Sequence, residues 1–157
     1  MKTKISTKQL VNAGFTDETE QSHVRALCEY LETSPDSLSR ESHDNYGLAV
    51  YSCGSREYAI GTDEEATDAA RANIKDSVWA FNASFLSGFC DLPEEVFEAM
   101  QGKCEGANDA FLSLVEKSGK FEDFADEAIS ADGRGHFMSS YDGNENEQGE
   151  FLIYRIN

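Results

Sequence analysis

The sequence predicts an α+β protein in which a small antiparallel three-stranded sheet packs against several short helices. Three observations support this prediction: a hairpin pattern in the first half of the chain, a helix start directly after it, and an apolar run at the C-terminus. Strands are expected at residues 47–53, 56–61 and 151–156. The helix that begins at Asp63 is expected to cover one face of this sheet.

Two helices are expected before the sheet. Residues 6–13 have Ser6 as an N-cap and are followed by Gly14, which is typical of a short helix with a glycine just past its end. Residues 17–31 repeat apolar side chains at the spacing of one helix face, and Pro35 comes soon after. The polar residues 33–46 are expected to form a loop.

The hairpin prediction rests on two apolar runs around a turn. Residues 48–51 and 57–60 flank Gly54-Ser55, a dipeptide suited to a two-residue turn. The four residues after the second run, Thr62-Asp63-Glu64-Glu65, match a capping box. In this motif the Thr62 hydroxyl and the Glu65 carboxylate each accept a hydrogen bond from a backbone N–H at the helix start. A helix should therefore start at Asp63.

Short helices are also expected in the second half of the chain. Pro93 followed by two glutamates is typical of a helix start, since acids suit the positive end of the helix dipole. Residues 131–150 are expected to form a polar loop before the last strand. Residues 108–117 and 120–129 are expected to form two further short helices, and residues 83–89 a short apolar turn or helix.

Charge sets the broadest limit on function. The 157 residues include 30 Asp and Glu but only 13 Lys and Arg, which gives a net charge of −17. We expect a single acidic domain over residues 1–157, with a short basic segment at residues 1–14 that carries +3. A surface this negative repels nucleic acid and anionic membranes, and it attracts a basic partner.

No motif in the sequence names a cofactor or a metal. Asp142, Asn144 and Asn146 occupy positions 1, 3 and 5 of a calcium loop, but position 6 is Glu147 and position 12 is Ile153. Both defining positions of the EF-hand are therefore broken. We expect a solvated turn here, with no metal and no cofactor.

Two other segments allow a functional and a structural interpretation. His136 with Asp142 could be an acid/base pair, and Arg134 could hold an anionic substrate, which makes an enzyme the main alternative. The structural interpretation is that Arg134 and His136 tie this loop to the acidic body. The aromatic segment 79–86 could be a partner-binding hot spot, although its helical spacing favours core packing.

Pairs of acidic residues are the candidate binding site. Seventeen charges at one per roughly 1.7 Å correspond to about 29 Å of duplex, or about nine base pairs, so an acidic face could imitate nucleic acid. We therefore expect a non-enzymatic protein that binds a basic, nucleic-acid-binding protein. The candidate contacts are Glu64, Glu65, Glu94, Glu95, Glu122, Asp123, Asp126 and Glu127.

Parts of residues 57–157 resemble small acidic accessory proteins of tailed bacteriophages and prophages. The resemblance lies in residues 57–66, 77–82, 133–143 and 154–157. It implies a virus-encoded protein in the cytoplasm of the host bacterium, where it would inhibit a defence or DNA/RNA-handling complex. A structural or assembly protein of the virion is a further alternative. The sequence leaves the target and the oligomeric state open.

Overall fold

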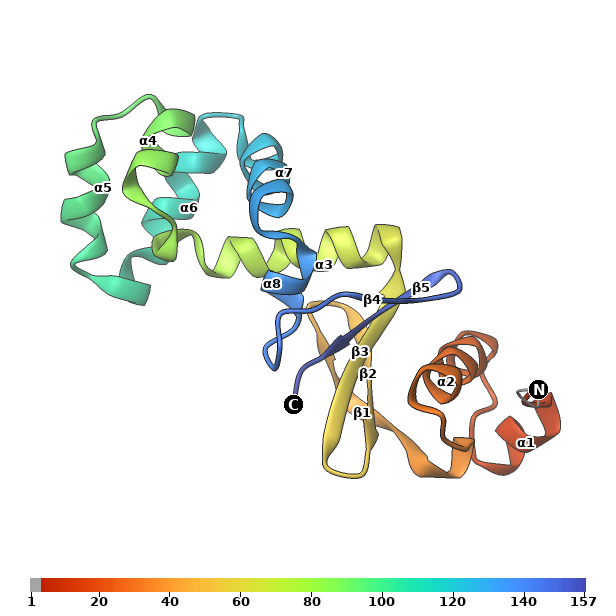
Figure 1. Ribbon diagram of the computed structural model, residues 1–157. Helices are drawn as coiled ribbons and strands as arrows, with labels where there is room; N and C mark the ends of the chain where they lie inside the picture. The colour runs from red at the N-terminus through yellow and green to blue at the C-terminus, as the bar shows by residue number, and fades with distance from the viewer. Residues whose placement is uncertain (1–3) are drawn as a thin grey trace. The chain divides into compact units, whose positions relative to one another are not determined.

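The computed structural model describes residues 4–157 and has the α+β class that the sequence predicts. Its antiparallel sheet has five strands, in the order β1-β2-β3-β5-β4 (Figure 1). Three of them, β2, β3 and β5, match the expected strands, whereas the sequence does not predict β1 and β4. The strands are β1 (Leu38–Asn45), β2 (Leu48–Cys53), β3 (Arg56–Thr62), β4 (Asn146–Gln148) and β5 (Phe151–Arg155).

Helices occupy most of the rest of the chain. The α-helices are α1 (Thr7–Asn12), α2 (Glu18–Leu31), α3 (Asp63–Asp76), α4 (Ala83–Cys90), α5 (Glu94–Gln101), α6 (Asn108–Lys117), α7 (Phe121–Asp132) and α8 (Arg134–Met138). Short 3₁₀ helices are η1 (Pro35–Ser37), η2 (Val78–Ala80) and η3 (Cys104–Ala107). None of the helices in residues 4–157 has the length and apolar character needed to cross a bilayer.

Contacts within the chain group its residues into two compact units. Unit 1 contains the described residues up to Ala69 together with Arg134–Asn157, and unit 2 contains Ala70–Gly133. Two compact units are compatible with one domain or with two, so the expectation of one domain over residues 1–157 stays a prediction.

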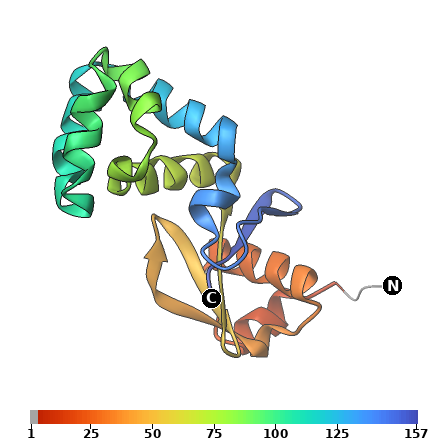
Figure 2. The same cartoon turned by 60° about the vertical axis from the view of Figure 1, so that its left-hand side comes forward.

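The main buried cluster of unit 1 joins the sheet to the N-terminal helices (Figure 1, Figure 2). Val24 and Leu27 of α2 and Leu10 of α1 are fully buried in it with side chains from one sheet face. The helix that begins at Asp63 contributes nothing to this cluster in the described part of the chain. α2, and not the helix that begins at Asp63, therefore covers this face of the sheet.

The start of α3 follows the predicted capping box. The Thr62 backbone N–H donates to the Glu65 carboxylate at 2.8 Å, and the Glu65 N–H donates to the Thr62 hydroxyl at 3.4 Å. These bonds satisfy two backbone groups at the point where β3 turns into α3. The side chain of Glu65 is thus committed to the helix start.

The two expected loops contain ordered elements, so both expectations were wrong in part. Residues 33–46 include β1, which pairs along β2 from Leu38↔Cys53 to Asn45↔Leu48 with an irregularity after Arg40. Residues 131–150 include α8 and β4. Both strands lie at an edge of the sheet, where side chains are largely exposed and carry little of the alternating pattern that predicts a strand.

Phenylalanines form the core of the helical unit 2. Phe124 of α7 lies within 4.9–5.5 Å, between ring centroids, of the phenylalanines at 81, 85 and 89. Phe97 of α5 stacks on Phe111 of α6 at 6.0 Å, and both are fully buried. Most of the aromatic segment 79–86 therefore serves packing, as its spacing favours.

Candidate binding groove

All three guanidinium nitrogens of Arg134 donate hydrogen bonds to side chains of the same protein. Its Nε and Nη2 donate to the two oxygens of the Glu145 carboxylate, each at 2.9 Å. Its Nη1 donates to the Asp63 carboxylate at 2.6 Å and to the Thr67 hydroxyl at 3.2 Å. Burial lowers the pKa of Arg134, but the hydrogen bonds to Glu145 and Asp63 outweigh it, so the net shift is upward. The guanidinium ties α8 to the start of α3, as the structural interpretation expects.

Tyr154 extends this cluster into the sheet. Its ring is fully buried, and its hydroxyl donates a short hydrogen bond to the Glu145 carboxylate. Burial and this hydrogen bond both raise the pKa of Tyr154. Glu145 therefore joins the guanidinium of Arg134 to the sheet, an arrangement that the sequence does not reveal.

His136 and Asp142 do not form the acid/base pair of the enzyme alternative. The Asp142 carboxylate accepts from the Asn144 backbone N–H at 2.9 Å and from the Ser139 hydroxyl at 2.8 Å, and these bonds lower the pKa of Asp142. His136 is exposed and packs edge-on against Phe137. Within residues 4–157 no hydrogen bond joins His136 to Asp142, and Arg134 is already occupied by carboxylates. The geometry gives this alternative no support.

The eight candidate acids lie on different elements. Glu64 and Glu65 are in unit 1 on α3, and the other six are in unit 2 on α5 and α7. Glu65 serves the helix cap, and Asp126 pairs with Arg71 at 2.8 Å. The other six side chains are exposed and form no salt bridge with any residue in the described range 4–157. They are Glu64, Glu94, Glu95, Glu122, Asp123 and Glu127.

Acidity is shared almost equally between the two units. Residues 1–69 and 134–157 together have 17 acidic and 8 basic residues, a net charge of −9, and residues 70–133 have 13 and 5, a net charge of −8. Within unit 2, α4 and α6 lie between α5, which carries Glu94 and Glu95, and α7, which carries the other four candidates (Figure 1). The eight candidates therefore come from three helices, α3, α5 and α7.

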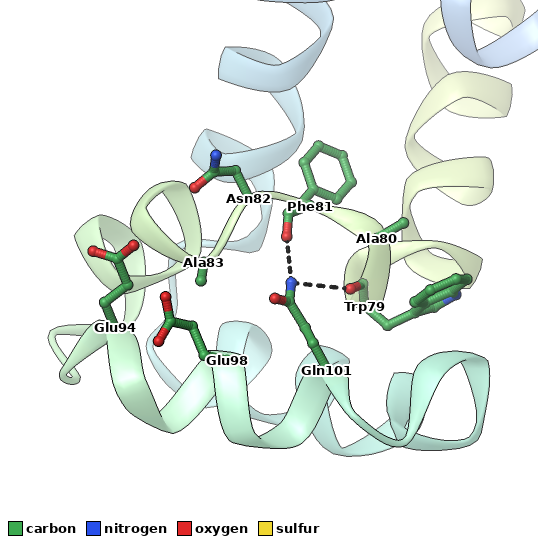
Figure 3. Close-up of a pocket in the computed structure, with 8 residues that line it drawn as sticks. All are labelled: Trp79, Ala80, Phe81, Asn82, Ala83, Glu94, Glu98 and Gln101. Carbon is green, nitrogen blue, oxygen red and sulfur yellow. Dashed lines mark hydrogen bonds between the residues drawn. The ribbon is translucent and has the colours of Figure 1, made fainter.

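An open groove of about 500 Å³ lies in unit 2 between α5 and the segment that joins η2 to α4 (Figure 3). Glu94, Glu98 and Gln101 line one side of the groove from α5. They share a helix face because they are spaced at i, i+4 and i+7. Trp79 of η2 lines the other side, at one end of the groove (Figure 3).

Polar contacts on two sides fix the backbone of Trp79. Gln101 Nε2 donates to the carbonyl oxygens of Trp79 at 3.2 Å and Phe81 at 2.6 Å (Figure 3). The Trp79 N–H donates to the Asn108 side chain at 3.2 Å, and the same side chain donates to the Lys75 carbonyl at 2.8 Å. The backbone of Trp79 is therefore anchored at this end of the groove, and its half-exposed indole points away from Glu94 and Glu98 (Figure 3).

Glu94 and the segment 79–86 could be singled out from the sequence, but the groove that they line could not. Glu98 and Gln101 were missed, although their spacing from Glu94 places all three on one face of α5. The proximity of Trp79 to that face depends on how η2 packs beside α5, which no local pattern reports.

Metal binding finds no support in residues 4–157, where no three His, Cys, Asp or Glu side chains are arranged to hold an ion. Comparison of the chain with protein-family models, curated proteins and solved structures found no match. The groove and the distribution of charge are therefore the features of the described residues that bear on function.

Proposed function

We propose that this protein is a binding protein that engages the basic surface of a nucleic-acid-binding partner through charge complementarity. The observation that carries the proposal is the set of six exposed carboxylates that form no salt bridge within residues 4–157. A carboxylate without an intramolecular cation contributes its full negative charge to the attraction of a basic partner. A carboxylate in an intramolecular salt bridge contributes less, because the neighbouring cation offsets its charge. The net charges of −9 and −8 give both units the same sign.

Imitation of nucleic acid is the form of this function that we favour. A channel built to bind a polyanion supplies Lys and Arg side chains, and these accept carboxylates as well as phosphates. The resemblance to small acidic bacteriophage proteins supports a target in the host bacterium, such as a defence or DNA/RNA-handling complex in its cytoplasm. Occupying that channel would inhibit the target without any chemical reaction.

Affinity capture with elution by nucleic acid tests the proposal. The immobilised protein is incubated with a bacterial lysate at about 50 mM salt, and bound proteins are eluted with duplex DNA at constant ionic strength. We expect DNA- or RNA-binding proteins in the eluate, and less capture as salt rises to about 300 mM, because exposed charges are then screened. An eluate that lacks nucleic-acid-binding proteins would contradict the proposal.

Two variants of equal net charge locate the contact. The first replaces the six carboxylates that form no salt bridge by Gln or Asn, which changes the net charge from −17 to −11. The control makes the same number of replacements at exposed acids elsewhere, four of them also in the first turns of α-helices or 3₁₀ helices. We expect the first variant to lose capture and the control to keep most of it. The control positions are Glu18, Asp36, Glu105, Asp109, Glu147 and Glu150.

A further inference from the structure

We propose that the side chain of Arg40 closes the free edge of the sheet in unit 1, so that β1 does not pair with a strand of a second copy of this protein. β1 is an outer strand of the sheet, and no strand in residues 4–157 pairs with its other side. Exposed edge strands are templates for pairing with another chain, and proteins block them with bulges and charged side chains. This role of Arg40 goes beyond the proposed function, because it concerns self-association rather than the capture of a partner.

A bulge interrupts β1 directly after Arg40. The strand pairs with β2 at Arg40↔Tyr51 and next at Asp44↔Ala49. Residues 41–43 of β1 therefore lie opposite a single residue of β2. A bulge disrupts the ladder and bends its strand, so β1 does not offer an incoming strand one regular row of N–H and C=O groups.

The guanidinium of Arg40 lies at this bulge and bridges the two strands. Its Nη1 donates to the Glu41 carbonyl at 2.6 Å, to the Val50 carbonyl of β2 at 3.1 Å and to the His43 carbonyl at 3.4 Å. Its Nη2 donates to the Asp44 carboxylate at 2.6 Å. β1 cannot straighten into a regular edge strand without losing these hydrogen bonds, which stabilise the bulge.

Packing against Tyr51 holds the guanidinium in this position. The guanidinium carbon lies 5.5 Å from the centroid of the Tyr51 ring, which is fully buried, and the Arg40 side chain is only 29 % exposed. Arginine suits this place because a planar guanidinium can lie over a ring while its edge donates to several acceptors. The exposed Arg56 of β3, in the same sheet, has no side-chain hydrogen bond or ion pair within residues 4–157.

A second copy of β1 is the strand that this edge would otherwise take. An antiparallel alignment of two β1 strands about Ser42 places Arg40 of one copy opposite Asp44 of the other, and Glu41 opposite His43. Opposite charges at facing positions favour strand pairing. Within one chain, the ion pair between Arg40 and Asp44 already uses two of these side chains. The internal contact therefore competes directly with self-association.

Sedimentation equilibrium of an Arg40→Met protein tests the proposal. Methionine keeps an apolar stem beside Tyr51 but has no donor for the carbonyls of the bulge, and it leaves Glu41 and His43 able to pair across two copies. We expect the weight-average mass to rise with protein concentration from about one chain toward about two, and to rise more than that of the unmodified protein. An Arg40→Met protein that keeps its circular dichroism spectrum and associates no more than the unmodified protein would overturn the proposal.

Arg56→Met and Arg134→Met are the controls. Each changes the net charge from −17 to −18, as Arg40→Met does. Arg56→Met removes an exposed arginine from the same sheet, and Arg134→Met removes contacts to Asp63 and Glu145, neither of which belongs to β1. We expect neither control to increase self-association. An equal increase in Arg56→Met would mean that charge alone matters, and an equal increase in Arg134→Met would point to partial unfolding. Either result would overturn the role of Arg40.

Hydrogen exchange locates the contact and also tests the unmodified protein, whose folding no variant can disturb. In the unmodified protein, the amides of residues 41–43 should exchange at the same rate at low and at high protein concentration. Slower exchange at high concentration would overturn the proposal, because the edge would then accept a strand despite Arg40. In the Arg40→Met protein the same amides should become protected as the copies associate. Protection confined to other segments would also overturn the proposal.

Discussion

Gly135 is the position where the structure makes its sharpest prediction about stability. The residue is buried in α8, and a Cβ atom placed there would lie 2.3 Å from the Gly143 carbonyl oxygen and 2.9 Å from the Asn144 carbonyl carbon. Both are backbone atoms, so the Gly135→Ala change must displace residues 143–145. That segment includes Glu145, which binds Arg134 and Tyr154.

The size of the effect follows from three contributions. Overpacking costs about 1–3 kcal/mol, and loss of one charge-assisted hydrogen bond at Glu145 costs about 1.5–3 kcal/mol. The higher helix propensity of alanine offsets these costs by about 0.5–1 kcal/mol. We therefore expect Gly135→Ala to lower the free energy of unfolding by roughly 2–5 kcal/mol.

Gly88→Ala is the matched control. Gly88 is exposed in α4, and a Cβ there meets no atom within 4 Å. The same chemical change should raise stability by about 0.5–1 kcal/mol, because only the helix preference remains. Urea denaturation followed by circular dichroism measures both variants. A Gly135→Ala protein as stable as the unmodified one, or shifted in the same direction as Gly88→Ala, would refute the close approach of α8 to residues 143–145.

Two further predictions concern the titratable groups of unit 1. His23 is 5 % exposed beside Tyr51, and burial lowers its pKa below 6.5. The unfolded chain therefore binds the proton first as pH falls, so the unfolding free energy should decrease below about pH 6.5. His23→Gln should flatten this dependence in thermal melts between pH 7.5 and 5. A slope equal to that of the unmodified protein would exclude His23 as the cause. Arg134→Met should cost about 2–3 kcal/mol in urea denaturation, because it leaves Glu145 without its bidentate partner. A cost below about 0.5 kcal/mol, typical of exposed ion pairs, would show that the contacts of Arg134 contribute little to the fold.

Local signals in the sequence determined the elements that depend on neighbouring residues. The capping box at Thr62 starts α3, Pro93 precedes α5, and the runs around Gly54 form the β2–β3 hairpin. Gly54 has φ of 64°, a backbone conformation that favours glycine, so the turn could be recognised from the residue alone. The apolar run at residues 151–156 predicted β5, which pairs with β3.

Tertiary structure decided everything that joins distant segments. β1 is polar and mostly exposed, and it is a strand because β2 supplies hydrogen bonds along its length. Arg134 forms an ion pair with Asp63, which is 71 positions away in the sequence. Trp79 lies beside α5, where the Gln101 side chain donates a hydrogen bond to the Trp79 carbonyl. The spacing of apolar residues and the capping motifs depend only on residues close together in the sequence, so they predict local elements and not contacts between distant segments. The sequence could therefore predict an acidic α+β protein, whereas the groove exists only because packing places α5 beside the segment that joins η2 to α4.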